Sequence, residues 1–544
     1  EREVPERPRT MAGPALIRAG EGSDPARPRC HLVTNGSYCV LALDSGVTSS
    51  RMGELQVVLD RPGQPCAPAG VSAFFQWASG VFGLTPAPLG QEGSYRWEFH
   101  RSGACWLWER ESLQARTALS IPRGENGELR QVELTWSGPE RLEGAVLFYL
   151  EPVLCPGQDF EAHPAFSRLF LEGVEEGGGA LFHRRPRGGE PERFLAVRWE
   201  GDGATVSLDR AWALGRGGLR ALPGWESGPL SSGVGSDPCL LVRIPVALEP
   251  GERASVSLAL AVGDGAGTAR EGAERILTGR GGEPGSLAPL AGRCQLSEGQ
   301  TMEAFSLLDR LVAGRPEAPS PQSALWPFGI SGDLPIAAGF LRGEEELETA
   351  LLWCRWHRFL TLAGWPFDLV LLVEEGGDYR RPLRAAVREE LKRLGGENSL
   401  GARGGVHTVD GSAGAVVLSW ARAVLPLQDG PDGAIPVGPA LPPVHLERSP
   451  AAWRAEEGQF TLETGDRLPP VGWMHVLCNE TFGWITDETG NGTLWTGGNS
   501  REGRLTPWQN DPLAVGGPER IPLEGEGRAC SVFADGDGYL CTVV

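Results

Sequence analysis

The residues best suited to chemistry in this sequence gather in residues 499–512, which read NSREGRLTPWQNDP. Pro507 and Pro512 cannot continue a helix, so we predict a loop. In such a loop an indole can stack on the apolar face of a pyranose ring, while guanidinium, carboxylate and amide groups bind its hydroxyls. The alternative is an exposed loop whose charges only pair with one another. We predict a sugar-binding site whose candidate residues are Trp473, Asn499, Arg501, Glu502, Arg504, Trp508, Asn510 and Asp511.

Other chemically capable residues have simpler structural interpretations. His163 sits among aromatic residues and is predicted to be a core histidine rather than an acid. Asp333 is predicted to turn the chain before a proline. The pair Asp209–Arg210 is predicted to be an ion pair beside a Gly-rich turn. Glu374–Glu375 ends a predicted parallel strand, where α/β proteins bind ligands, but a solvated pair is the commoner arrangement.

The composition limits which kinds of molecule the chain can bind. The chain has 544 residues with 77 glycines and 44 prolines, which favours turn-rich β architecture over helical bundles. A net charge of −20 argues against nucleic acid and against adhesion to an anionic membrane. A neutral glycan is compatible with that charge. No apolar run is long enough to span a membrane, so we expect no membrane insertion by this segment.

The cysteines and histidines indicate the redox state of the compartment and whether the chain holds a metal cofactor. The 11 cysteines are scattered singly without a CxxC pair, which is typical of free, mostly buried thiols in a reducing, cytoplasmic compartment. The 8 histidines show no HExxH or HxH spacing, so we predict no metal and no other cofactor. The chain starts at Glu1 rather than at Met, and we interpret it as a segment of a longer polypeptide.

Residues 30–262 read as short strands separated by turn residues. A strand pair over 31–43 is broken at Asn35-Gly36, which is typical of a type I′ turn. Residues 131–136 alternate between polar and apolar, as a half-buried strand requires. So many strands predict a mainly β fold built on a large antiparallel β-sandwich. Further strands are predicted over 55–59, 95–100, 104–109, 114–121, 145–154, 193–199, 240–248 and 254–262.

Helical patterns begin near Ser297, where a short linking helix is predicted. Residues 325–335, LWPFGISGDLP, form an apolar turn. A small α/β segment then follows, and it is not a nucleotide fold because no GxGxxG comes after its strand. We predict a helix from 344, a buried parallel strand over 367–373, a helix over 380–394, a strand over 405–409 and a helix over 412–425.

The chain is therefore predicted to divide into consecutive parts of different character. A second β region opens with strands over 459–463 and 472–478 and reaches the candidate loop. The parts are a mobile lead-in (1–29), a β-sandwich (30–295), a helical linker (296–325), a small α/β segment (326–429), a Pro/Gly linker (430–450) and a second, incomplete β-sandwich (451–544).

Taken in order, motifs of this chain resemble the C-terminal region of cyclic β-1,2-glucan synthases, which belongs with the cellobiose and chitobiose phosphorylases in glycoside hydrolase family 94, formerly glycosyltransferase family 36. The resemblance runs from about Leu32 to about Arg520. Two departures stand out: residues 45–52 read SGVTSSRM where an aromatic SGYSRW-like stretch is expected, and Gly503 replaces an Asn. The matching segments are NGSY (35–38), HPAFSRLF (163–170), DR and GRG (209–210, 215–217), LWPFGISGDLP (325–335), Gly364 with DLV (368–370), PPVGW (469–473) and NSREGRLTPWQNDP (499–512).

The resemblance implies a galactose mutarotase-like β-sandwich that carries carbohydrate, followed by a helical linker and an (α/α)6 barrel that holds the general acid and the phosphate site. We expect no such barrel within these 544 residues. We therefore expect a segment of a β-glucan synthase or phosphorylase, most simply a β-1,2-glucan one, that is not active alone. It would bind and orient a β-glucan or glucooligosaccharide for phosphorolysis or glycosyl transfer by the barrel of the parent chain, with inorganic phosphate as the parent's co-substrate.

Two other functions stay open. The first is a non-catalytic scaffold that packs the domains of a larger synthase together. The second is a self-contained inverting glycosidase that uses Glu502 with Asp511 or Asp487. The resemblance is also compatible with a homodimer and with the cytoplasmic part of an inner-membrane protein.

Overall fold

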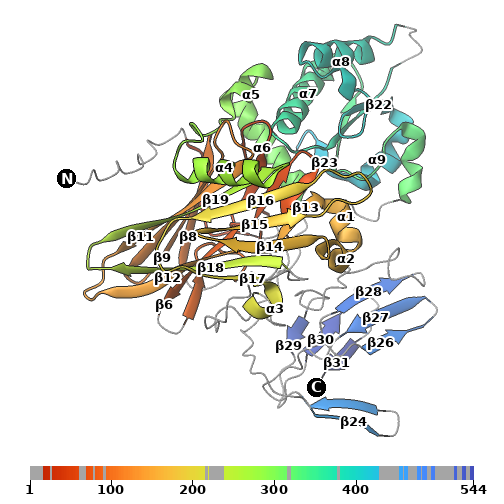
Figure 1. Cartoon of the computed structure of the whole chain (residues 1–544). Coiled ribbons are helices and arrows are strands. Elements are labelled where there is room, and N and C mark those ends of the chain that lie inside the picture. Colours follow the sequence, from red (N-terminus) through yellow and green to blue (C-terminus); the bar gives the residue numbers. More distant parts are fainter. Residues whose placement is uncertain are drawn as a thin grey trace.

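The computed structural model shows a mainly β chain, as predicted, with a helical part between β regions (Figure 1). Antiparallel sheets make up the β regions, and the four-stranded sheet between them is parallel. The structure describes residues 16–24, 27–60, 69–77, 80–89, 93–214, 219, 238–314, 320–375, 380–427, 452–456, 459–463, 475–479, 481–486, 492–496, 520–522, 530–533 and 540–543.

The large layer of the sandwich is a nine-stranded antiparallel sheet in the order β1-β8-β9-β10-β11-β19-β16-β15-β14. Its central strands follow the predicted alternation: Val132, Leu134 and Trp136 of β11 are buried, and the residues between them are partly exposed. The strands are β1 (Leu16–Glu21), β8 (Ser94–His100), β9 (Gly103–Arg110), β10 (Leu113–Ser120), β11 (Gly127–Trp136), β14 (Leu171–Glu176), β15 (Gly179–Arg184), β16 (Arg193–Trp199) and β19 (Arg253–Gly263).

Two five-stranded sheets form the opposing layer, in the orders β17-β18-β12-β6-β7 and β13-β5-β4-β3-β2. One core cluster joins all three sheets, and its fully buried members include Trp106, Phe75, Phe148 and Val40. The strands are β2 (Cys30–Thr34), β3 (Cys39–Leu43), β4 (Thr48–Met52), β5 (Leu55–Val58), β6 (Ser72–Trp77), β7 (Gly80–Gly83), β12 (Leu142–Leu150), β13 (Pro152–Pro156), β17 (Thr205–Asp209) and β18 (Pro238–Leu248).

The hairpin between β2 and β3 exists as predicted, but its turn is not a two-residue type I′ turn. Thr34 pairs with Cys39, so four residues form the connection. The Asn35 carboxamide oxygen accepts hydrogen bonds from the backbone N–H groups of Ser37 (3.1 Å) and Tyr38 (2.9 Å). Asn35 therefore shapes the turn through its side chain, which the dipeptide signal alone does not reveal.

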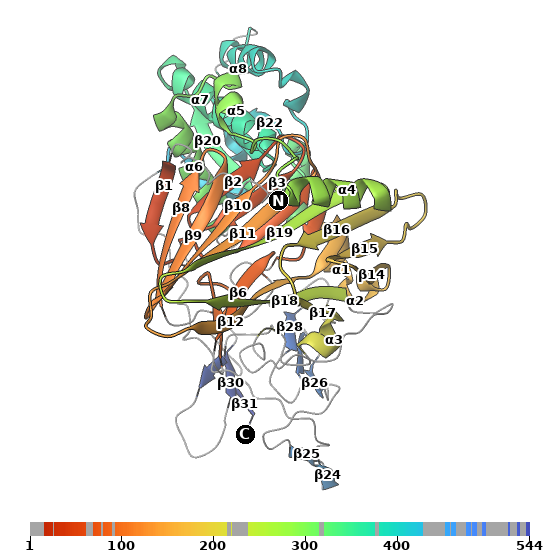
Figure 2. The same ribbon diagram turned by 60° about the vertical axis from the view of Figure 1, so that its left-hand side comes forward.

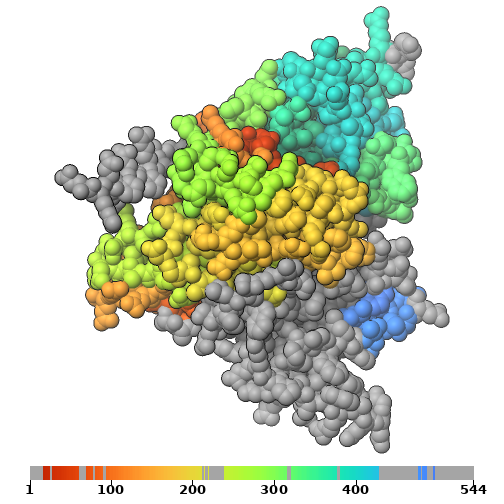
Figure 3. Space-filling view, viewed as in Figure 1, coloured from red at the N-terminus to blue at the C-terminus, as the bar shows by residue number. Residues whose placement is uncertain are grey.

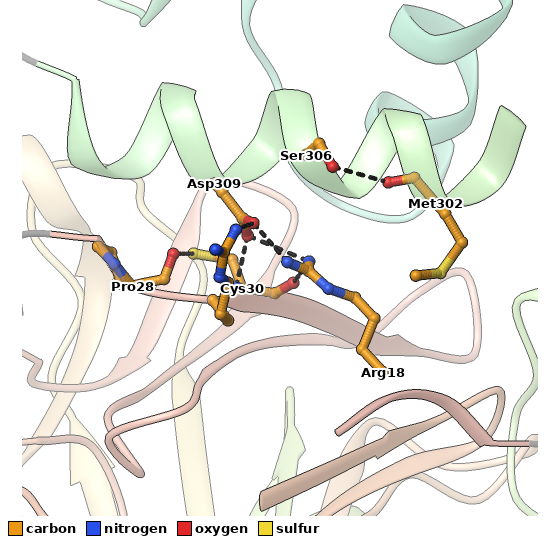
Figure 4. A network of polar contacts seen from close by, with 7 residues as sticks. Arg18, Pro28, Cys30, Met302, Ser306 and Asp309 are labelled. Atoms are coloured by element: carbon orange, nitrogen blue, oxygen red, sulfur yellow. Dashed lines mark hydrogen bonds and ion pairs between the residues drawn. The ribbon is translucent and has the colours of Figure 1, made fainter. Parts of the chain in front are cut away.

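Part of the region predicted as a mobile lead-in is an ordered strand. Leu16–Glu21 forms β1 and pairs antiparallel with β8. Asp309 of α6 (Glu298–Ala313) holds this edge in place by accepting from the guanidinium groups of Arg18 and Arg29 and from the backbone N–H of Cys30 (Figure 4). Residues 1–15 lie outside the described residues.

Helices cover the upper part of the sandwich, and two of them were not predicted. Helix α4 (Ala266–Leu277) lies along β19 and β16, while α5 (Ala288–Arg293) precedes the predicted linking helix α6 (Figure 2). The start of α6 follows from a local signal. Ser297 Oγ accepts from the Gln300 N–H, and the Gln300 side chain accepts from the Ser297 N–H, which forms a capping box.

The α/β segment contains a parallel sheet in the order β22-β21-β20-β23. The predicted helix over 412–425 is wrong in its second half, because Ala421–Leu425 pairs with β20 instead. The strands are β20 (Ile336–Leu341), β21 (Asp368–Val373), β22 (Val406–Asp410) and β23 (Ala421–Leu425); the helices are α7 (Leu347–Leu362), α8 (Pro382–Arg393) and α9 (Gly414–Trp420), with 3-10 turns η2 (Gln322–Ala324), η3 (Trp326–Phe328), η4 (Glu344–Glu346), η5 (Glu397–Ser399) and η6 (Gly411–Ala413).

The α/β segment rests on the sandwich (Figure 3). A second core cluster crosses this contact and includes Leu41 of β3, Phe305 of α6 and Phe359 of α7. Small C-terminal sheets lie at the other end of the sandwich (Figure 2), and the predicted strands near 459 and 475 are present. These strands are β24 (Ala452–Glu456), β25 (Gln459–Glu463), β26 (His475–Cys478), β27 (Phe482–Thr486), β28 (Gly492–Thr496), β29 (Arg520–Pro522), β30 (Cys530–Phe533) and β31 (Leu540–Val543). The division of the chain into domains stays a prediction.

Candidate functional site

The residues that the sequence marks as sugar-binding have no described placement. Trp473, Asn499, Arg501, Glu502, Arg504, Trp508, Asn510 and Asp511 all lie outside the described residues. The same holds for Asp487 of the glycosidase alternative. The site is therefore built from motifs that the structure does describe.

Two motifs far apart in the sequence meet at one buried carboxylate, Glu151. Arg168, within HPAFSRLF, lies on α2 (Pro164–Arg168), and its Nη2 atom is 2.6 Å from Glu151 Oε2. Arg210, within the DR motif, starts α3 (Arg210–Ala213), and its Nη1 is 3.4 Å from the same oxygen. Tyr149 Oη donates to Glu151 Oε1 at 2.7 Å. We call these four residues the Glu151 cluster.

The Glu151 cluster is almost completely removed from solvent. Glu151 is 2% exposed, Arg168 and Arg210 are 4% exposed, and Tyr149 is fully buried. Burial raises the pKa of Tyr149 well above its usual range, and the nearby Glu151 carboxylate raises it further, so the phenol stays protonated and acts as a donor. A buried carboxylate that receives charged donors fixes α2 and α3 against the end of β12. By fixing α2, the Glu151 cluster also fixes the exposed side chains that α2 carries.

That surface carries exposed aromatic and apolar side chains at helical spacing. Phe166 is 45% exposed and Leu169 is 51% exposed. The Phe166 and Phe170 rings meet edge to face at 5.3 Å, and the Arg187 guanidinium lies over both, 5.0 and 5.1 Å from their centroids. We call His163, Phe166, Leu169, Phe170 and Arg187 the Phe166 surface. Its first four residues lie on α2 and on either side of it, directly after the short helical turn α1 (Gly157–Ala162), and Arg187 follows β15 (Figure 1).

The prediction for His163 is wrong, because this residue is exposed rather than in the core. It precedes Pro164 at the start of α2, and that turn directs it away from the sandwich. The aromatic pair was a missed signal, since Phe166 and Phe170 stand four residues apart, a spacing that brings side chains together where the chain turns helically. Phe166 lies on α2, and Phe170 lies two residues after the end of that helix. Arg187 gives no such signal, because a separate hairpin brings it to the rings.

The other residues for which the sequence analysis gave a structural interpretation have partners within the protein. Asp333 accepts from Gln322 at 3.0 Å, which agrees with a turn-forming role. Arg210, one half of the predicted Asp209–Arg210 pair, has Glu151 as an ion-pair partner. Glu375 is not a solvated carboxylate: its Oε1 accepts from the backbone N–H of Leu383 at 2.7 Å and so caps α8.

The contact between the sandwich and the α/β segment includes Asp333 of the LWPFGISGDLP motif. Arg403 Nη1 lies 2.8 Å from Glu54 of the sandwich, and its Nε lies 3.9 Å from Asp333 of the GISGD turn. In the stretch that lacks the expected aromatics, the Arg51 guanidinium lies 5.6 Å from the centroid of Trp365. These residues hold two parts of the chain together.

A shallow hollow of about 510 Å³ lies on the outer face of β6, β12 and β18. Its lining includes Glu143 and Arg243, and Arg243 Nε donates to Gln76 Oε1 at 2.6 Å. Guanidinium, amide and carboxylate groups on one sheet face can bind hydroxyl-rich ligands. The hollow has no exposed aromatic ring among its described lining residues, unlike the Phe166 surface.

Comparison with known families decides the class of protein. The model of the glycosyl hydrolase 94 supersandwich domain matches residues 13–278 and 457–516. This chain belongs to the glycosyl hydrolase 94 supersandwich family. The family predicted from the ordered motifs is thereby confirmed. The two matched stretches contain both the sandwich and the candidate loop at 499–512, with the α/β segment between them.

The chain is also similar to the cyclic β-(1,2)-glucan synthase NdvB of Rhizobium meliloti (strain 1021). The two are 25% identical over 476 residues, which cover 74% of this chain and 16% of that protein. This glycosyl hydrolase 94 chain thus spans a small part of its relative's length. Among the described residues, no helix is long and apolar enough to cross a membrane.

Comparison with solved structures finds weaker similarities. A putative kojibiose phosphorylase from the human microbiome is 6% identical, with a TM-score of 0.31 over 63% of this chain and 41% of that one. A putative aldose 1-epimerase from Escherichia coli K12 is 12% identical, with a TM-score of 0.26 over 45% of this chain and 99% of that one.

Proposed function

We propose that this chain binds a β-glucan and orients it for phosphorolysis or glycosyl transfer at a separate barrel-type catalytic domain. The observation that carries the proposal is the two-part match to the glycosyl hydrolase 94 supersandwich, which includes the loop at 499–512 together with the sandwich. This match supports treating the loop and the sandwich as one sugar-binding unit. The name of the NdvB relative supports a β-1,2-linked glucan.

The chemistry needed from this chain is recognition rather than bond breaking. Inverting phosphorolysis requires an acid that protonates the departing oxygen, and inorganic phosphate that attacks the opposite face of the sugar. Orientation requires apolar faces for the sugar ring and donors for its hydroxyls. Trp508 with Arg501 and Arg504 offers that combination in the loop. The Phe166 surface offers a second one, in which Phe166 is exposed beside the Arg187 guanidinium.

Calorimetric titration of the whole chain tests this function. Linear β-1,2-glucan should bind, cello-oligosaccharides should bind more weakly, and maltooligosaccharides should serve as the unbound control. Trp508→Ala should weaken binding of the β-1,2-glucan, while Phe166→Ala tests the second surface separately. A matched control is Phe328→Ala, which removes a ring of the LWPFGISGDLP segment (325–335) outside both surfaces. Absence of heat with every β-glucan at millimolar concentration would refute the proposal.

A scaffold role is the second candidate, and the contact between sandwich and α/β segment favours it. Arg403 bridges Glu54 and Asp333, and a common apolar core crosses the same boundary. A scaffold that touches no sugar would bind no glucan, either as the wild-type chain or as Trp508→Ala. Titration of the wild-type chain with β-glucan therefore separates the two functions.

A further inference from the structure

Three metal-binding side chains meet on one face of the β8–β9 hairpin. Glu98 and His100 are two residues apart on β8, so they point to the same side of the sheet. The hairpin register pairs Glu98 directly with Cys105 of β9, which brings the thiol to that side as well. The opposite side carries Trp97 and Phe99, which belong to the sandwich core.

The distances between the ligand atoms fit one small ion. Glu98 Oε2 lies 3.3 Å from His100 Nε2 and 3.6 Å from Cys105 Sγ, and Sγ lies 3.8 Å from Nε2. Zinc bonds of about 2.0 Å to oxygen or nitrogen and about 2.3 Å to sulfur, at tetrahedral angles, place their ligand atoms roughly 3.3–3.6 Å apart. The three ligand atoms therefore already lie close to three corners of a tetrahedron around one ion.

Small residues stand opposite two of the three ligands in the neighbouring strands. Glu98 pairs with Ala19 of β1, and Cys105 pairs with Ala118 of β10, so small side chains flank the ligands on both sides. The Glu98 side chain is 42% exposed and that of His100 is 14% exposed, which gives an ion access from solvent. Cys105 itself is buried, as a zinc-bound thiolate commonly is.

We propose that Glu98, His100 and Cys105 bind one zinc-class divalent ion, with water at the fourth position. A thiolate together with an imidazole selects zinc, cobalt or similar borderline metals over calcium and magnesium, which prefer oxygen ligands. One carboxylate and one thiolate also balance the two charges of the ion. A bound ion would connect β8 to β9 and stabilise the edge of the nine-stranded sheet.

The competing interpretation is a metal-free hydrogen-bonded cluster. In that state burial raises the pKa of Cys105 to about 12, so the group is a neutral thiol that can donate to Glu98. Arg116, which lies near the thiol and ion-pairs with Glu133, would favour this arrangement over a nearby cation. The two states differ in one measurable respect, which is a sulfur–metal bond.

Titration of chelator-treated protein with Co²⁺ tests for that bond. We expect one Co²⁺ per chain, an intense near-ultraviolet sulfur-to-cobalt absorption band, and its loss when stoichiometric Zn²⁺ displaces the cobalt. Cys105→Ser should remove the band and weaken Zn²⁺ binding by at least about 100-fold, because losing a ligand costs more than losing an outer partner. His100→Asn should weaken Zn²⁺ binding similarly, which keeps the test open if one variant folds poorly.

The matched control is Cys354→Ala, which removes a fully buried thiol on α7. It should leave the band and the Zn²⁺ affinity unchanged. Folding of each variant is checked by circular dichroism before titration. A wild-type chain without a sulfur–cobalt band, or a Cys105→Ser chain that binds Zn²⁺ as tightly as the wild type, would overturn the proposal.

Discussion

Asp309 on helix α6 receives two hydrogen bonds from the guanidinium of Arg18 on β1, at 2.5 and 3.2 Å. Both side chains are 9% exposed, and the two residues stand 291 positions apart in the sequence. The pair thus joins the first described strand of the sandwich to the helix that leads into the α/β segment (Figure 4).

Asp309→Ala should destabilise the whole chain strongly. The substitution leaves Arg18 nearly buried without its carboxylate and removes the acceptor of the Cys30 N–H, so we expect a loss of about 3–5 kcal/mol in the free energy of unfolding. Urea denaturation measures it. Glu298→Gln on the same helix is the control: its ion pair with Arg101 is exposed and should contribute less than about 1 kcal/mol. Equal effects of the two substitutions would contradict the prediction.

Glu151→Gln should loosen α2 and α3 together. Gln keeps one acceptor but removes the negative charge that faces the buried guanidinium groups of Arg168 and Arg210. We expect a loss of roughly 3 kcal/mol or more in unfolding free energy, together with faster proteolysis between β13 and β14. Glu172→Gln, whose partner Arg185 is half exposed, is the matched control and should change stability little. A Glu151→Gln chain as stable as the control would show that the Glu151 cluster contributes little to the unfolding free energy.

Stability should rise with pH between about 4 and 6.5. Burial lowers the pKa of His31 to about 3 and that of His357 to about 4, so in this window both bind protons in the unfolded chain but not in the folded one. Burial raises the pKa of Asp44 to about 7, which acts in the opposite direction. The net difference of one proton predicts a rise of about 1.4 kcal/mol per pH unit.

Urea denaturation at several pH values across that window measures the slope. Asp44→Asn keeps an acceptor for the Ser45 N–H and removes the opposing titration, so it should make the slope steeper. A flat profile, or a shallower slope in Asp44→Asn, would contradict the prediction.

Trp508→Ala should separate a sugar contact from a core contact. If the indole stacks on a pyranose, the substitution should weaken glucan binding by ~1–3 kcal/mol and leave the melting temperature almost unchanged. If the indole is core, the substitution should cost ~3–5 kcal/mol of stability instead. We expect the first result. Arg504→Lys is the companion variant, since it keeps the charge and loses the bidentate fork. Unchanged glucan binding by a well-folded Trp508→Ala chain would refute the sugar contact.

The chain alone should release no sugar phosphate from a β-linked glucooligosaccharide and inorganic phosphate. The reason is that the resemblance assigns the general acid and the phosphate site to a barrel domain. Chromatography of the reaction mixture against a protein-free blank measures the product. Formation of glucose 1-phosphate above the blank would mean that this chain carries its own catalytic groups.

Elements built from near neighbours could be predicted from the sequence. The alternation around Val132 and Leu134 predicted a half-buried strand, and Ser297 predicted the start of α6, because each signal depends on contacts within a few residues. The apolar run over 367–373 likewise predicted the buried parallel strand β21. The ordered motifs predicted the family for the same reason, since they are read directly along the chain.

Elements that depend on distant partners could not be predicted this way. Ala421–Leu425 has an ambiguous local pattern and becomes a strand because β20 offers it a free edge. Arg187 reaches the Phe166 ring only because a hairpin returns beside α2.

The sequence by itself determined the mainly β class, the family and the candidate sugar loop. Only the tertiary structure decided that His163 is exposed, that Glu151 joins the HPAFSRLF and DR motifs, and that Glu98, His100 and Cys105 share one face. The physical reason is strand register: a pairing between separate strands sets which side chains meet, and a shift of one residue would send them to opposite faces of the sheet.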